Sequence, residues 1–182
     1  CYFHSELSAA EQAHRVKAWL LHSGEYQRLQ DTYDPTHYRM ATFAGPMDIT
    51  NLFNKYGRCV INFDCAPQAF LVSGDYPVRY DAPGSIFNPT LFPANPLVTV
   101  YGSGAGTVTL GQRTVQIFSI RDQLILDCDL QDAYRVPDTG IMENCNGSIY
   151  ALPFPQLQPG DNPVEFTGDI TGIEIIPRWW EL

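Results

Sequence analysis

The chain has 182 residues and a formal net charge of −9, and 45% of its residues are hydrophobic. This hydrophobic content is enough for buried cores, and the negative charge argues against a nucleic-acid or anionic-membrane surface, which needs clustered Lys and Arg. Fourteen Gly and fourteen Pro with 13% aromatic residues favour many short strands and turns over helices.

Five cysteines, at positions 1, 59, 65, 128 and 145, are predicted to be free thiols, because their number is odd and no metal-ligand spacing accompanies them. On one extended strand, Cys59 and Cys65 would lie about 20 Å apart, too far to bridge. Unpaired thiols indicate a reducing compartment. The chain opens abruptly on Cys1-Tyr2-Phe3, so we expect a fragment that lacks an N-terminal segment.

One amphipathic helix is predicted in the first part of the chain. Ser8 and Glu11 have the spacing of a capping box, which places the helix at residues 9 to 22 or 23. His14 and His22 lie eight positions apart on it and are predicted to be residues at the solvent edge, because no carboxylate accompanies them as a metal ligand.

Short extended runs follow at residues 26–29, 38–43, 47–53 and 58–65, separated by turn chemistry. Together with the helix they predict an α+β N-terminal domain over residues 1–80. Residues 81–96 hold four prolines and are predicted to be a linker, with an ordered extended segment as the alternative.

Residues 97–182 are predicted to form an antiparallel β-sandwich or jelly roll. Strands are expected at 97–101, 106–110, 113–120, 123–127, 129–135, 148–152, 164–168 and 170–176. Residues 102–106, 111–112 and 121–122 are read as hairpin turns. The end of the chain, residues 177–182, is rich in large apolar side chains and is expected to be docked as a closing strand.

No catalytic constellation stands out, so we expect no enzyme, no cofactor and no metal. The densest acidic cluster is Asp122, Asp127, Asp129 and Asp132. It lacks the central Gly and distal Glu of a calcium loop, and nothing selects a pair of carboxylates for glycoside hydrolysis. Solvated turns and strand edges are the favoured interpretation of these residues.

Trp179 and Trp180 could form a stacking platform for a sugar. Alternating side chains would place one ring inward and one outward, so core packing of one ring with the other half-exposed is the favoured interpretation. A carbohydrate-binding module built on this pair is the alternative function.

Several motifs resemble those of one protein family, the distal tail proteins of long, non-contractile-tailed bacteriophages (siphophages). In the first half they are residues 18–20, 29–35, 38–39, 43, 45–46, 48–49, 63, 65, 67–68 and 70. In the second half they are residues 88–90, 93–96, 154–162 and 177–182. The resemblance spans nearly the whole chain through the order and spacing of these motifs.

The resemblance implies a structural virion protein of the tail tip or baseplate, assembled in the bacterial host cytoplasm from a phage or prophage. Members form a hexameric ring through the first domain, link the tail tube protein to the tail-tip hub protein, and let DNA pass without specific binding. The second domain is implied to be a galectin-like sandwich that docks a receptor-binding protein. No membrane partner is expected.

Overall fold

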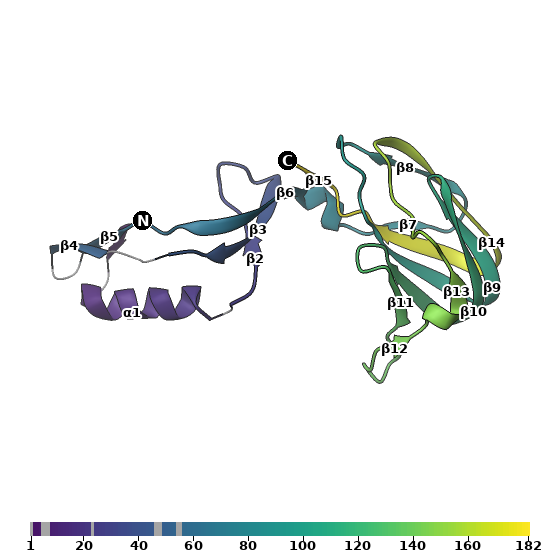
Figure 1. Cartoon of the computed structure of the whole chain (residues 1–182), viewed down its shortest axis with the longest axis horizontal. Helices are drawn as coiled ribbons and strands as arrows, with labels where there is room; N and C mark the ends of the chain where they lie inside the picture. The colour runs from purple at the N-terminus through teal and green to yellow at the C-terminus, as the bar shows by residue number, and fades with distance from the viewer. Residues whose placement is uncertain (1, 5–7, 23, 46–48, 54–55) are drawn as a thin grey trace. The chain divides into compact units, whose positions relative to one another are not determined.

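The computed structural model describes residues 2–4, 8–22, 24–45, 49–53 and 56–182. The chain divides into two compact units, residues 1–69 and residues 70–182. Both are built mainly of antiparallel strands, and the α-helix of the described residues lies in the first unit (Figure 1). The predicted fold class, mainly β with one amphipathic helix before a sandwich-like unit, is confirmed.

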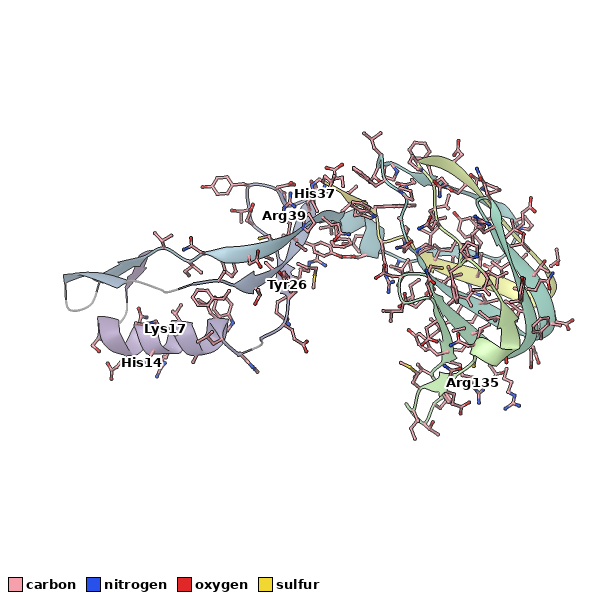
Figure 2. The ribbon with its side chains drawn as sticks, viewed as in Figure 1. His14, Lys17, Tyr26, His37, Arg39 and Arg135 are labelled. Atoms are coloured by element: carbon pink, nitrogen blue, oxygen red, sulfur yellow. The ribbon has the colours of Figure 1, made fainter. Side chains whose placement is uncertain are left out.

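Helix α1 (Ala9–Leu20) begins where the capping box predicts. The Glu11 amide donates to Ser8 Oγ at 3.3 Å, and the Ser8 amide donates to Glu11 Oε2 at 3.0 Å. These two bonds satisfy amides that the helix itself leaves without partners. The helix ends slightly earlier than predicted. His14 and His22 are exposed, and Figure 2 shows His14 beside Lys17 on α1.

The first unit contains two small groups of strands. One has the order β1 (Tyr2–His4), β5 (Tyr56–Cys59) and β4 (Ile49–Phe53), and the other has the order β2 (Gln27–Leu29), β3 (His37–Phe43) and β6 (Phe63–Leu71). The strand predicted over residues 58–65 is wrong as one element, because β5 ends before β6 begins. The start of the strand predicted over residues 47–53 lies outside the described residues.

The second unit holds the remaining elements. In chain order they are the 3-10 turn η1 (Val72–Asp75), β7 (Val78–Tyr80), β8 (Gly84–Asn88), β9 (Leu97–Leu110), β10 (Arg113–Asp127), β11 (Asp132–Arg135), β12 (Glu143–Asn144), the 3-10 turn η2 (Asn146–Ser148), β13 (Ile149–Tyr150), β14 (Gly160–Ile176) and β15 (Trp180–Glu181).

The boundary between the units differs from the expected one. The units divide after Ala69 rather than near residue 80. Residues 81–96, expected to be a linker, contribute β8 to the second unit, where β8 pairs with β14. Ala94 also forms a β-bridge with Leu157. The extended-segment alternative therefore describes this stretch better, since its backbone bonds are made within the sandwich.

Three long strands, β9, β10 and β14, run through the second unit. The first half of β9 pairs with the second halves of β10 and β14, and β11 and β7 flank this layer. The second half of β9 pairs with the first halves of β10 and β14, and β13 and β8 flank the other layer. Each long strand therefore contributes to two sandwich-like layers. Figure 1 labels the three strands β9, β10 and β14.

The hairpin turns predicted at residues 102–106 and 121–122 are wrong, because both segments lie inside long strands. The turn at residues 111–112 is confirmed: it connects β9 to β10, and Gly111 has φ 57°. Glycine and Asx residues are common both in turns and at β-bulges, so local sequence did not separate the two.

Bulges mark the point where the long strands pass between layers. In β10, Val115 and Ile117 are buried before the bulge, whereas Ile120 and Leu124 are buried after it. One extra residue in the strand shifts the two-residue alternation and lets the strand bend. A similar register shift occurs in β14 around Thr171.

Glycines make the bend possible. We call Gly102, Gly104, Gly106 and Gly168 the glycine corner. A Cβ on Gly102 or Gly106 would collide with a carbonyl oxygen of β14, and one on Gly168 would collide with a carbonyl oxygen of β9. A Cβ on Gly104 would collide with the Asp169 carboxylate, which accepts a hydrogen bond from the backbone amide of the next residue of β9 at 3.3 Å. The two backbones can approach this closely only without side chains.

One hydrophobic core fills the space between the layers. Its fully buried large side chains come from both halves of the long strands and from the segment before β14: Val98, Val100, Val108, Leu110, Val115, Leu124, Leu126, Leu157, Val164, Ile173 and Ile175. The second unit therefore has its own core.

The glycine corner predicts a sharp difference between two glycine-to-alanine substitutions. Gly102→Ala places a methyl group against the backbone of β14 and should lower the free energy of unfolding by about 1–3 kcal/mol. Gly147→Ala has open space around the new Cβ, so it should change stability by less than about 0.5 kcal/mol. Urea titration in a Trp19→Phe background measures this, because the remaining tryptophans, Trp179 and Trp180, lie in the second unit. Equal stability of the two variants would contradict the close approach.

Candidate functional site

The predicted acidic cluster is dispersed among separate local contacts. Asp129 accepts a hydrogen bond from Asn95 at 3.1 Å, and Asp132 accepts one from Asn146 at 2.6 Å. Asp122 is exposed, with φ 68°. Within the described part of the chain, no three His, Cys, Asp or Glu side chains are grouped so that they could hold a metal ion.

Asp127 is the buried member of this cluster, and it pairs with Arg178 near the end of the chain. Arg178 Nη1 donates to Asp127 Oδ1 at 2.8 Å, and Nη2 donates to Oδ2 at 3.2 Å. The amides of Asp129 and Leu130 also donate to Asp127 Oδ1. This two-point geometry fixes Arg178 relative to the end of β10.

The ion pair determines the charge state of Asp127. Burial alone would raise the pKa of this carboxyl, but hydrogen bonds from Arg178 and from the Leu130 and Asp129 amides outweigh burial and hold the pKa below its ordinary value. Asp127 therefore stays ionised at neutral pH as the fixed partner of Arg178. It is not a proton donor for catalysis.

The backbone around Arg178 is also held in place. Arg178 has φ 58°, a backbone conformation that residues other than glycine rarely adopt. Its amide donates to the Gly74 carbonyl at 2.9 Å. The Leu71 amide donates to the Trp179 carbonyl at 2.9 Å. A Cβ on Gly74 would collide with the Trp179 amide nitrogen. The chain end is thus docked, as the sequence predicted. The prediction that it closes the sandwich is wrong, because β15 pairs with β6 and is not part of the sheet that holds β9, β10 and β14.

Both tryptophans make packing contacts. Trp179 is 5% exposed and belongs to the core. Trp180 is half-buried, stacks on Phe92 with ring centroids 4.6 Å apart, and donates through Nε1 to the Pro93 carbonyl at 2.9 Å. One face and the polar atom of Trp180 are therefore already occupied. Sugar stacking on this pair stays a prediction, and the geometry supports packing.

Two buried asparagines fasten the segments that flank the long strands. Asn88 Nδ2 donates to the carbonyls of Phe92 and Leu157, and Asn88 Oδ1 accepts from Thr90. Asn162 accepts from the Gln158 amide and donates to the Gln158 carbonyl at 2.7 Å. The side-chain amide of each asparagine thus pairs with backbone groups of an irregular segment that would otherwise be buried without hydrogen-bond partners.

These contacts bring together motifs that are far apart in the sequence. Residues 88–90, 93–96, 154–162 and 177–182 meet through Asn88, the Ala94–Leu157 bridge and Trp180. Sequence reasoning identified the motifs and the docked end. It missed that Arg178 is the partner of Asp127, because no local pattern links positions 51 residues apart.

The first unit carries an open groove of about 470 Å³, which we call the first-unit groove. Its lining is largely apolar and consists of Trp19, Leu20, His22, Glu25, Gln27, Arg28, Leu29, Ala41, Thr42, Phe43 and Phe63. The Trp19 side chain is 73% exposed. Where side chains of this unit are described, the buried hydrophobic residues are Ala41 and Ala69. The first unit thus leaves apolar surface uncovered by its own fold.

Side chains next to the first-unit groove tie its strands together. Tyr26 Oη donates to Asp64 at 2.9 Å, and Arg39 Nη1 donates to the Pro67 carbonyl at 2.8 Å. Figure 2 labels Tyr26, which directly precedes β2, and Arg39 of β3. Hydrogen bonds therefore hold the strands together beside the apolar lining of the groove.

The described thiols are free, as predicted. Cys65 is exposed, Cys145 is half-buried and Cys128 is buried. Burial raises the pKa of the Cys128 thiol to about 12, so this side chain stays protonated and unreactive. Cys1 and the side chain of Cys59 lie outside the described residues.

Across the described residues, no helix combines the length and apolar character needed to cross a membrane.

The Asp127–Arg178 pair predicts a pH-dependent loss of stability. The pKa of Asp127 in the folded chain lies below that of an unfolded Asp, about 3.9, so the pair stabilises above that pH and is lost as pH falls through the lowered folded pKa. Asp127→Asn should therefore cost about 2 kcal/mol at pH 7, and its difference from wild type should shrink below about pH 4.

The control for this prediction is Asp81→Asn. Asp81 also pairs with an arginine, Arg79, but its side chain is 72% exposed, so little stability should be lost. Urea titrations from pH 3 to pH 7 compare the two variants. A loss for Asp127→Asn that is independent of pH, or equal losses for both variants, would contradict the assigned role of the pair.

Comparison with known proteins leaves the sequence without a match: no protein-family model fits it, and no curated protein resembles it in sequence.

A comparison of structures finds a match. The chain is similar to a crystal structure of the SPP1 Dit protein, described as a paradigm of the hub adsorption apparatus in phages that infect Gram-positive bacteria. The TM-score is 0.65 and the identity is 12%, over 98% of this chain and 75% of the SPP1 chain. At this identity the likeness shows a shared fold, and it extends across both units of the chain.

Proposed function

We propose that the chain is a structural component of a phage tail tip, in which copies assemble into a ring that joins the tail tube to the tail-tip hub. The observation that carries the proposal is the fold shared with SPP1 Dit over 98% of the chain. The motifs of the second half that resemble siphophage distal tail proteins also contact one another in the second unit.

The first unit supplies the surface between copies in this proposal. Its first-unit groove exposes apolar side chains, and few side chains in its described part are buried. Ordinary monomers bury such surface, and an extensive uncovered patch is typical of a protein interface. Neighbouring copies would therefore cover the apolar side chains that the described part of the first unit leaves exposed. The same proposal includes a hexameric ring, as the family resemblance implies.

The second unit has a complete core of its own, so it needs no neighbour for stability. It is free to dock further tail components, among them a receptor-binding protein. The net charge of −9 suits a conduit for DNA, since like charge suppresses binding to phosphates. Assembly in a bacterial cytoplasm and residence in the virion agree with the free thiols of the described residues.

Trp19→Ala is the variant that tests this proposal. Since the Trp19 side chain is 73% exposed, its removal should leave the far-ultraviolet circular dichroism and thermal midpoint of the dilute chain unchanged. It should weaken association by tenfold or more, because exposed aromatic side chains are common anchors of interfaces. Light scattering over a concentration series measures the association, and negative-stain microscopy shows its symmetry.

Tyr33→Ala is the matched control, because Tyr33 is an aromatic residue of the same unit that is 97% exposed and does not line the first-unit groove. It should associate like wild type. Closed rings for wild type and for Tyr33→Ala, and none for Trp19→Ala, support the proposal. A wild-type chain that stays monomeric at every concentration would overturn it.

A further inference from the structure

A second cavity lies wholly within the second unit. It has a volume of about 230 Å³, and we call it the amide pocket because side-chain amides dominate its lining. Its lining residues are Asn95, Gln112, Arg113, Cys128, Asp129, Gln131, Pro153, Phe154, Gln156 and Gln158. Trp179 and Trp180 do not line it.

The bend in β10 assembles this pocket. Arg113 begins β10 and Gln112 directly precedes it, whereas Asp129 and Gln131 follow its end. Over 15 residues, a straight strand would separate its ends by about 50 Å. Because the strand passes from one layer to the other, both ends reach the same cavity. The pocket is therefore a direct product of the sandwich and needs no second copy.

Part of the pocket is ordered by its own hydrogen bonds. Gln156 Nε2 donates to Asn95 Oδ1 at 3.0 Å, and Asn95 Nδ2 donates to Asp129 Oδ1 at 3.1 Å. These two hydrogen bonds orient three side chains. They leave the side-chain amide oxygen of Gln156 and the second carboxylate oxygen of Asp129 as acceptors. These bonds orient the three side chains before a ligand arrives, which lowers the entropic cost of binding.

Three further polar side chains of the lining are exposed to solvent. Gln112, Arg113 and Gln131 make no side-chain hydrogen bond to the described residues. Each glutamine amide offers two donors and an acceptor, and Arg113 offers donors only. The pocket thus presents donors and acceptors side by side, and Pro153 and Phe154 add an apolar strip.

This chemistry selects the class of ligand. Each hydroxyl of a sugar both donates and accepts a hydrogen bond, so neighbouring hydroxyls match neighbouring amide and carboxylate groups, and the C–H face of the ring matches an apolar strip. Arg113 is positively charged and Asp129 is negatively charged. Asp129 repels phosphorylated ligands and Arg113 repels cationic ones, so a neutral ligand is favoured. The volume is below the several hundred Å³ typical of drug-sized ligands, so it suits one sugar ring.

We propose that the amide pocket binds a single neutral pyranose unit of a glycan. A peptide is the less suitable ligand, because apart from Pro153 and Phe154 the pocket has little apolar wall to receive a side chain. The site lies in the second unit and does not require ring formation, so its failure in an experiment would leave the proposed tail-tip role standing.

Saturation-transfer difference NMR on the whole chain tests this proposal, because the method works for monomers and for large assemblies. The probes are methyl α-D-glucopyranoside, methyl β-D-galactopyranoside, methyl α-L-rhamnopyranoside and N-acetylglucosamine, with glucose 6-phosphate and a capped Gly-Ala-Gly peptide as comparisons. We expect saturation transfer to at least one neutral sugar and a weaker signal for the phosphorylated one.

Gln112→Ala and Gln156→Ala should each weaken the binding about tenfold, as the loss of one or two hydrogen bonds would. Gln116→Ala is the matched control, since Gln116 is an exposed glutamine of β10 outside the pocket. Circular dichroism checks that the variants keep their fold. No transfer to any neutral sugar, transfer to the peptide alone, or binding lost in Trp180→Ala but kept in both pocket variants would overturn the proposal.

Discussion

The close approach of β9 and β14 at the glycine corner is the constraint on which the second unit depends. Side chains at Gly102, Gly106 or Gly168 would collide with backbone carbonyls of the opposite strand. Because this contact and the adjacent bulges let three long strands turn together, one continuous sheet supplies both layers around a single core. The same turn brings the two ends of β10 to the amide pocket. It also leaves Asp127, at the end of β10, in position to bind Arg178.

The two units differ in how far they bury their apolar side chains. The second unit closes its core with its own strands and fastens its chain end through Arg178 and the tryptophans. The first unit leaves Trp19 and the first-unit groove exposed. The proposed assembly would use this contrast: neighbouring copies would cover the exposed apolar surface of the first unit, and the second unit would present docking surfaces. The function proposed for the chain therefore rests on the unequal burial of the two units together with the shared fold.

Local signals in the sequence predicted the features that local interactions determine. The capping box at Ser8 placed α1, and the apolar chain end predicted the docked tryptophans. The misassigned elements depend on contacts between distant residues. The glycines of residues 102–106 have the composition of a hairpin tip, yet they serve as a corner because β14 approaches them. Likewise, the proline-rich residues 81–96 become sandwich structure only through pairing with β14. The amide pocket was missed because its walls come from four separate segments.

Amide hydrogen exchange, measured on the dilute chain and on its concentrated form, tests the unequal burial most directly. The account predicts that β9, β10 and β14 exchange slowly in both samples, because their core is complete without a partner. Amides of β2, β3 and β6 should exchange rapidly in the dilute sample and become protected when copies associate. Equal protection of both units in the dilute monomer, with no change on concentration, would contradict the account.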